Sequence, residues 1–153
     1  MDVHATLDAP CDPAALFAFV DDLALYPQWI DLVHHAEPLL GGETDGAPVR
    51  PAWQVELRAR LGPFARSKRL RMERTEHDLS RHVAVFERAE LDGRRHSPWV
   101  LRADVTSSGE GSTLHMHLHY GGGLWTGGVM ERALADQITQ GRQRLTELVL
   151  AAR

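Results

Sequence analysis

The sequence predicts an α+β domain in which a curved antiparallel sheet of about seven strands wraps around a long C-terminal helix. Three observations carry this prediction. Apolar and polar residues alternate along 53–61, turn-forming glycines separate several further alternating segments, and apolar residues at helical spacing form a stripe in the last part of the chain. The helices are segregated from a run of hairpin-connected strands, which is typical of the α+β class rather than of alternating βαβ units.

Length and composition limit the kinds of protein that this chain can be. The chain has 153 residues, a net charge of −4 and 43% hydrophobic residues. These values suit one globular domain over residues 1–153. The negative charge gives no general attraction for phosphate backbones, so we expect no nucleic-acid partner. No apolar run reaches the roughly 18 residues of a membrane span, and the single Cys11 cannot form an internal disulfide, so we expect a cytoplasmic protein.

The N-terminal part is expected to hold two strands and two short helices. Asp12 supplies a helix N-cap and Pro13 suits the first helical position, whereas Pro27 disfavours helical geometry in the residue before it. Pro38 indicates an edge strand. The predicted elements are a strand over 3–9, a helix over 14–25, a second helix over 28–34 and an edge strand over 37–42.

Three turns arrange the remaining strands as consecutive hairpins. Gly62-Pro63 follows the clearest alternating segment, Asp92-Gly93 is a strong signal for a two-residue hairpin turn, and residues 109–111 form the last turn. The predicted strands are 53–61, a strand through 70–74, 83–91, 95–106 and 113–120.

A long helix is predicted after the glycine-rich segment 121–128. Its apolar stripe consists of Met130, Leu134, Ile138, Gly141, Leu145 and Leu148. Gly141 within this stripe indicates close backbone contact with the sheet. The spacing of the glycine-rich segment does not fit a dinucleotide loop, so we interpret it as a cavity mouth beside Trp125 or as a plain turn.

Counting outward from the turns predicts which side chains meet inside the sheet. Trp99 is expected opposite both Phe86 and Tyr120, and Trp53 beside an inward Arg74. Such a surface would line an apolar cavity with a few polar groups, and the alternative is that the aromatic residues simply fill a close-packed core. The side chains expected to contact a ligand are Trp29, Trp53, Leu57, Leu70, Met72, Phe86, Trp99, Leu101, Met116, Trp125, Met130, Leu134 and Ile138.

Two surface patterns each have a plain and a functional interpretation. His115, His117 and His119 are spaced as zinc or copper ligands can be, but the register points them to solvent, so we expect no metal site. Arginines over 58–71 gather on the outer face of one hairpin. We expect cross-strand ion pairs there, such as Glu56 with Arg71, and the alternative is a surface that binds protein or RNA.

Together these features resemble the START-like superfamily, also called SRPBCC, and most closely its polyketide cyclase/dehydrase branch. The resemblance spans nearly the whole chain. It is carried by Asp12-Pro13, by the segment VDDLALYPQW over 20–29, by the series of hairpins and by GRQRL over 141–145. It implies a helix-grip fold with a hydrophobic pocket between the sheet and the C-terminal helix.

The resemblance implies two functions for such a pocket, because a fold does not select one function. The first is binding or carriage of a small hydrophobic molecule, polyketide-like, lipid-like or aromatic, without a cofactor. The second is an enzyme that cyclises and dehydrates a poly-keto chain, in which Arg74 would stabilise an enolate and Tyr120 or His82 would donate or accept a proton. A protein-interaction module is the third interpretation, and the sequence is compatible with a monomer or a homodimer.

Overall fold

The computed structural model describes residues 2–39, 50–61, 63–121 and 128–152, and within these ranges the backbone alone for residues 60, 61, 64 and 128–134. The described strands form one antiparallel sheet of seven strands in the order β1-β7-β6-β5-β4-β3-β2, which confirms the predicted fold class. The strands are β1 (Asp2–Ala9), β2 (Val33–Leu39), β3 (Ala52–Leu61), β4 (Phe64–Asp78), β5 (Val83–Arg88), β6 (Trp99–Ser108) and β7 (Gly111–Tyr120). The helices are α1 (Pro13–Phe17), the 3₁₀ helix η1 (Leu23–Gln28) and α2 (Gly128–Ala151).

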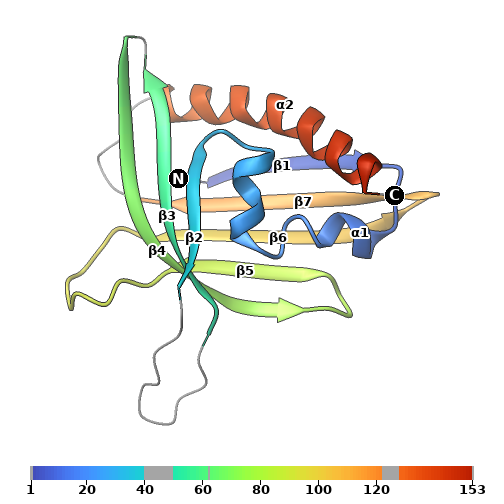
Figure 1. Ribbon diagram of the computed structural model, residues 1–153, viewed down its shortest axis with the longest axis horizontal. Helices are drawn as coiled ribbons and strands as arrows, with labels where there is room; N and C mark the ends of the chain where they lie inside the picture. The colour runs from blue at the N-terminus through green and yellow to red at the C-terminus, as the bar shows by residue number, and fades with distance from the viewer. Residues whose placement is uncertain (1, 40–49, 62, 122–127, 153) are drawn as a thin grey trace.

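The sheet bends around the C-terminal helix. Figure 1 shows β2 and β3 running at a steep angle to β6 and β7, with α2 lying across the inner side of this bend. Helix α1 contacts β6 and β7, and η1 contacts the edge strand β2. None of the described helices has the length and hydropathy needed to cross a bilayer.

Two short helices follow β1 as predicted, but both lie largely within the range that was predicted for the first helix alone. Helix α1 ends at Phe17, and η1 starts afresh at Leu23 because the Asp22 carboxylate accepts a hydrogen bond from the backbone N–H of Ala24 at 2.9 Å. A helix over 28–34 does not form, since β2 already begins at Val33. The apolar spacing over 14–25 reflects residues that are buried from two separate turns rather than from one continuous helix.

The hairpin β6–β7 has the predicted register, with Trp99 opposite Tyr120 and Leu101 opposite Leu118. The other two registers were predicted wrongly by two residues. The ladder between β3 and β4 continues to Leu61 and Phe64, so Trp53 lies opposite Met72 rather than opposite Arg74. A shift of two keeps every side chain on its predicted face.

The connection between β5 and β6 is not the expected two-residue hairpin. Strand β5 ends at Arg88 and β6 begins at Trp99. The Asp92 carboxylate accepts a hydrogen bond from the backbone N–H of Arg94 at 3.0 Å, and His96 contacts the same carboxylate. This local turn replaces strand pairing, so Phe86 lies opposite Leu101 instead of Trp99.

Candidate functional site

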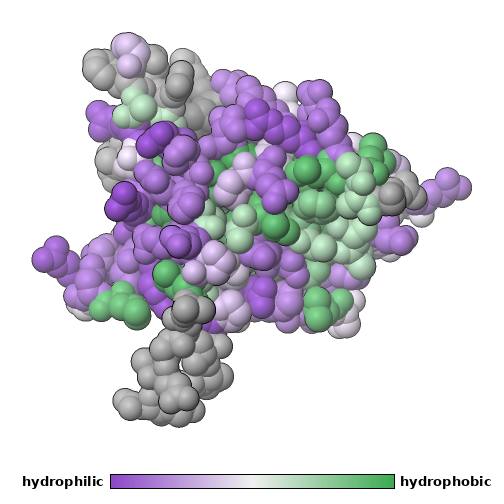
Figure 2. Space-filling view, viewed as in Figure 1, coloured by the Kyte–Doolittle hydropathy of each residue, from purple (hydrophilic) through white to green (hydrophobic). Residues whose placement is uncertain are grey.

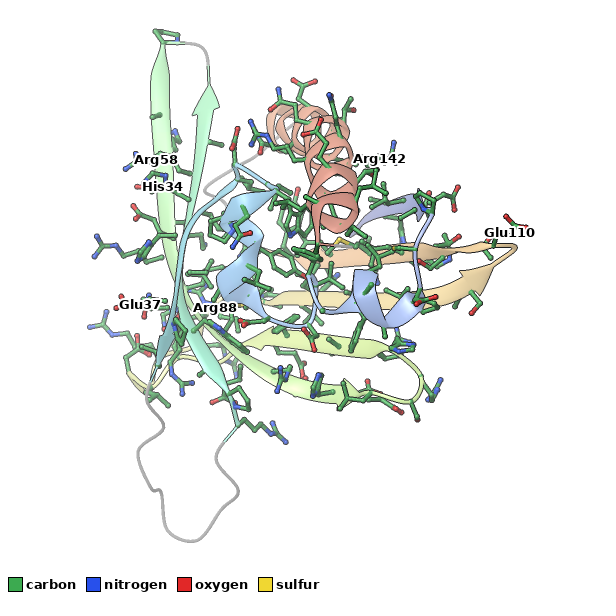
Figure 3. All side chains as sticks on the ribbon, turned by 45° about the vertical axis from the view of Figure 1, so that its right-hand side comes forward. His34, Glu37, Arg58, Arg88, Glu110 and Arg142 are labelled. Carbon is green, nitrogen blue, oxygen red and sulfur yellow. The ribbon has the colours of Figure 1, made fainter. Side chains whose placement is uncertain are left out.

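A cavity of about 140 Å³ lies between the inner face of the sheet and α2. Its walls come from six strands, from η1 and the segment that follows it, and from the middle of α2, and almost all of the lining side chains are apolar. The exceptions among the described residues are Thr6, Tyr26 and Arg142. Arg142 is exposed on the side of α2 next to β1, where Figure 3 labels it.

Much of the expected ligand-binding set lines this cavity. The lining members are Trp29, Leu57, Leu70, Met72, Trp99, Leu101, Met116 and Ile138. Trp53 and Phe86 do not line it: they are buried against each other, with ring centroids 5.5 Å apart in an edge-to-face arrangement. Trp125 and the side chains of Met130 and Leu134 lie outside the described residues.

Sequence reasoning missed two parts of the wall. Val3, Ala5 and Leu7 of β1 line the cavity, and the alternation of polar and apolar residues along this strand was the sequence signal that could have identified them. The second part is the segment from η1 to the start of β2, which contributes Tyr26 and Ile30. No periodic pattern marks that segment, because it is irregular backbone.

None of the three residues suggested as catalytic lies among the described lining residues. Arg74 does stand beside Trp53 as predicted, with its guanidinium carbon 5.9 Å from the ring centroid, but its Nη1 donates a hydrogen bond to the carbonyl of Asp21 at 2.9 Å. His82 packs its ring edge-to-face against Phe17 at 5.4 Å.

Tyr120, the third of these residues, stacks on a wall of the cavity without lining it. Its ring lies 5.1 Å from that of Trp99. Tyr120 therefore packs against the Trp99 indole without lining the cavity. Strand β7 contributes no acid or base to the described lining.

The segment after η1 holds α2 in place over the cavity. Leu32 donates its backbone N–H to Oε1 of Gln137 at 2.8 Å, and Asp31 accepts a hydrogen bond from Arg144. Gly141 is buried against Trp29, which satisfies the expectation of a close backbone approach, although the partner is this tryptophan rather than a strand.

Tyr26 is the one buried side chain in the described lining with a titratable group. Its hydroxyl donates a hydrogen bond to the carbonyl oxygen of Val20 at 2.8 Å. Burial raises the pKa of Tyr26 far above its ordinary value, and the nearby carboxylates of Asp21 and Asp22 raise it further. The phenol is therefore neutral at every working pH and already has a hydrogen-bond acceptor.

Two lining tryptophans have an unpaired donor. The indole Nε1 atoms of Trp29 and Trp99 are buried and have no hydrogen-bond partner among the described residues. Trp53 differs, because its Nε1 donates to Oδ1 of Asp22 at 3.2 Å. Buried N–H groups are nearly always paired in folded proteins, so the two cavity indoles stand out.

A positive group lies next to Trp99. Lys68 points to the inner face of β4, and its Nζ lies 5.9 Å from the centroid of the Trp99 ring. Partial burial lowers the pKa of Lys68, and the charge of Arg88 lowers it further, whereas Glu90 acts in the opposite direction. Arg88, labelled in Figure 3, is bound by Glu90 at 3.0 Å, while no carboxylate of the described residues lies within ion-pair distance of Lys68.

The outer face of the β3–β4 hairpin carries ion pairs within single strands, not the cross-strand pairs that were expected. The predicted pair between Glu56 and Arg71 is wrong: Arg71 binds Glu73 on its own strand at 2.7 Å, and Arg58 lies 3.8 Å from Glu56. Figure 2 shows hydrophilic side chains over much of the left of the molecule, where Figure 1 labels β2 and β3.

The histidines of β7 lie on the solvent face as expected. His117 and His119 share the carboxylate of Asp2, at 2.8 and 3.1 Å, and His4 stacks on His117 with ring centroids 4.2 Å apart. Among the residues that the structure describes, no three His, Cys, Asp or Glu side chains are grouped so that they could hold a metal ion.

Comparisons with known proteins agree with this architecture. A family model described as "Polyketide cyclase / dehydrase and lipid transport" matches residues 1–149. No curated protein matches the chain.

Several solved structures share the fold. TTHA0849 from Thermus thermophilus is 22% identical, with 99% of each chain covered and a TM-score of 0.69. CV1439 from Chromobacterium violaceum is 11% identical, with 97% of this chain and 96% of that chain covered and a TM-score of 0.65. Ara h 8.0201 is 15% identical, with 99% and 98% covered and a TM-score of 0.62. At these identities the likeness shows the fold.

Proposed function

Because the chain belongs to the polyketide cyclase/dehydrase and lipid-transport family, whose fold binds hydrophobic ligands, we propose that it binds a small apolar molecule with one ring or a short chain in the cavity beneath α2. One observation carries the proposal: a cavity of about 140 Å³ with an almost entirely apolar lining. Apolar cavities of roughly 150 Å³ stay dry and admit a benzene-sized molecule. Pockets for drug-sized ligands span about 300–1,000 Å³, so a polycyclic ligand would require the lining side chains to move.

Binding is favoured over catalysis by the chemistry of the wall. An aldol cyclisation needs a group that accepts a proton and a group that stabilises the enolate. In the described lining, the phenol of Tyr26 is neutral and already donates to Val20, and Thr6 and Arg142 are exposed. A catalytic role for Arg74, His82 or Tyr120 would require a substrate that reaches beyond this cavity.

Toluene is a suitable first probe, because it has the size of the cavity and no hydrogen-bonding group. We expect saturable binding, detected as shifts of the methyl resonances of Met72 and Met116 and as a change in tryptophan fluorescence, since Trp29 and Trp99 are in the wall. Native mass spectrometry of the purified protein would identify a molecule that copurifies. Absence of any saturable effect up to the solubility limit of toluene would overturn the proposal.

The cytoplasmic location stays a prediction, which fractionation of the producing cells would check. The interaction-module interpretation stays a prediction as well. That interpretation requires arginines of the β3–β4 hairpin that are available to a partner. Arg58 and Arg71 are not, because each lies in an ion pair with a glutamate of its own strand.

A further inference from the structure

The far half of the β3–β4 hairpin has a charge unlike that of the chain as a whole. Residues 57–72 contain six cationic side chains and no carboxylate, whereas the whole chain has a net charge of −4. The six are Arg58, Arg60, Arg66, Lys68, Arg69 and Arg71. Figure 1 shows this end of β3 and β4 at the top left, standing beyond the start of α2. A positive charge concentrated on a projecting hairpin attracts an anionic surface locally, although the chain is acidic overall.

Two of these arginines are free to bind a partner. Arg66 and Arg69 are exposed, and in the described part of the chain no carboxylate lies within ion-pair distance of either. Glu56 lies opposite Arg69 in the ladder, but its carboxylate is within ion-pair distance of Arg58 instead, at 3.8 Å. The charges of Arg66 and Arg69 are therefore not neutralised by the hairpin itself.

The turn at the end of this hairpin is apolar in sequence. Leu61 and Phe64 form the last pair of the ladder, and Pro63, which is exposed, lies between them in the chain. Arg66 follows Phe64 by two residues, which is a distance of about 7 Å along a strand. Apolar groups of segments that bind a bilayer surface enter it to a depth of about 5–10 Å. With the turn at that depth, Arg66 would lie at the level of the lipid headgroups.

Cations lie on both faces of the hairpin behind this turn. Strand alternation puts Arg66 on the inner face with Lys68, and Arg69 on the outer face. This arrangement suits entry of the hairpin end into a layer of anionic headgroups, which surround it on every side. A nucleic acid would contact one face of the hairpin and would leave the apolar turn without a partner, so a bilayer fits these residues better.

We propose that the end of the β3–β4 hairpin docks onto an anionic phospholipid bilayer. The turn residues enter the headgroup layer, and Arg66 and Arg69 bind the anionic groups of the lipids. Each cation close to an anionic bilayer raises the affinity by about fivefold, and salt screens this attraction. The inference goes beyond the proposed function and does not depend on what the cavity binds.

Vesicle sedimentation with the full chain tests the docking. We expect binding to phosphatidylcholine vesicles that contain about one third phosphatidylserine, and a loss of at least about tenfold when the salt is raised from about 0.05 M to about 0.5 M. Vesicles of phosphatidylcholine alone should not bind. Equal binding to both kinds of vesicle, or binding to neither, would overturn the inference. Polyuridylic acid is the nucleic-acid arm, and tighter binding to it than to the acidic vesicles would also overturn the inference.

Two double variants separate the hairpin from the net charge. Arg66→Gln combined with Arg69→Gln should weaken binding to the acidic vesicles by about tenfold or more. The matched control combines Arg94→Gln with Arg95→Gln, which removes two exposed arginines from the connection between β5 and β6. The control should change the affinity by no more than about twofold. Equal losses in the two double variants would mean that net charge attracts the vesicles, and would overturn the assignment to the hairpin.

A fluorescent probe at the turn tests its entry into the bilayer. The single cysteine, Cys11, is buried, so a cysteine placed at an exposed position can be labelled with an environment-sensitive fluorophore. The emission of a label on Pro63→Cys should shift to shorter wavelength with acidic vesicles. A label on Leu91→Cys, at a position that is 79% exposed in the connection between β5 and β6, should not shift. No shift at position 63, or an equal shift at position 91, would overturn the docking of this hairpin.

Discussion

Gly141 of α2 packs directly against Trp29. A Cβ atom at position 141 would lie 3.1 Å from the carbonyl oxygen of Trp29 and 3.4 Å from its ring. The absence of a side chain at this point lets the helix approach the indole that forms part of the cavity wall. The position of α2 and the shape of the cavity therefore depend on the same contact.

A bulkier residue at position 141 should loosen that contact. Gly141→Val adds atoms where even a Cβ is too close to backbone, so we expect the free energy of unfolding to fall by about 2–3 kcal/mol and toluene affinity to fall several-fold. Chemical denaturation and calorimetric titration would measure both. Gln140→Val, on the exposed neighbouring position, is the control and should lose only about 0.5 kcal/mol of stability. Equal losses in the two variants would contradict the packing argument.

Removing the indole nitrogen should lower the stability more where its N–H is paired than where it is unpaired. Trp53→Phe breaks the hydrogen bond to Asp22, so we expect it to lower the free energy of unfolding by roughly 2 kcal/mol more than Trp99→Phe, which removes an unpaired donor. Urea unfolding of the two variants in the absence of ligand measures the difference. A Trp99→Phe variant that is as unstable as Trp53→Phe would mean that the Trp99 donor is satisfied in solution.

Filling the cavity should abolish binding without destabilising the protein. Ala5 lines the cavity from β1, so Ala5→Leu should reduce toluene affinity at least about tenfold while the free energy of unfolding is unchanged or rises slightly. Ala103 provides the matched control, since it is fully buried and does not line the cavity. Ala103→Leu should cost about 1–3 kcal/mol of stability. Similar destabilisation at both positions would show that the space beside Ala5 is filled.

Stability should depend on the ionisation of Asp2. The hydrogen bonds from His117 and then His119 lower the pKa of this carboxyl below its ordinary value of 3.8. A depressed pKa in the folded state means that the stabilisation is fully present above the unfolded pKa and is lost as the pH falls through the lower folded value. The difference in unfolding temperature between the unaltered protein and Asp2→Asn should therefore be fully present at about pH 5 and narrow as the pH falls below about 4. A carboxyl titration of Asp2 by NMR with an ordinary midpoint would refute this prediction.

Substitutions at the three residues suggested as catalytic should spare ligand binding. Arg74→Gln, His82→Gln and Tyr120→Phe alter groups outside the described cavity lining, so we expect toluene affinity to stay within about twofold. Arg74→Gln should lower the free energy of unfolding by about 1 kcal/mol, because its hydrogen bond to the carbonyl of Asp21 is lost. A large loss of affinity in any of the three variants would mean that the bound ligand extends beyond the cavity.

The face of the sheet on which a side chain lies could be predicted from the sequence. The residue opposite it on the neighbouring strand could not. Alternation decides which face of a strand is buried, and an error of two residues leaves that decision intact. This is why Leu57, Leu70 and Met72 were assigned to the cavity correctly although their register was wrong. The β6–β7 hairpin was also predicted in register, because its strands run up to a tight turn and Trp99 then falls opposite Tyr120.

The features that the sequence did not predict depend on how side chains and segments meet in the folded structure. The carboxylate of Asp92 organises a local turn within a longer β5–β6 connection instead of the expected two-residue turn. Phe86 therefore lies opposite Leu101 rather than Trp99, and its ring contacts Trp53. Lys68 shares its inward face with Leu70, so alternation could have indicated it, but the contact with Trp99 needed the bend of the sheet. Likewise the unpaired indole of Trp29 becomes evident only when its neighbours are known.

The pairing of β1 with β7 determines when the fold can be completed during synthesis. Asp2 meets His119, a residue 117 positions further along the chain, so the first strand emerges from the ribosome long before its partner exists. Contacts of such high sequence separation slow folding and leave a strand edge unprotected until they form. A nascent chain that is stalled before β7 would therefore expose the inner face of β1, and chaperones that hold exposed apolar segments would be expected to act on this intermediate.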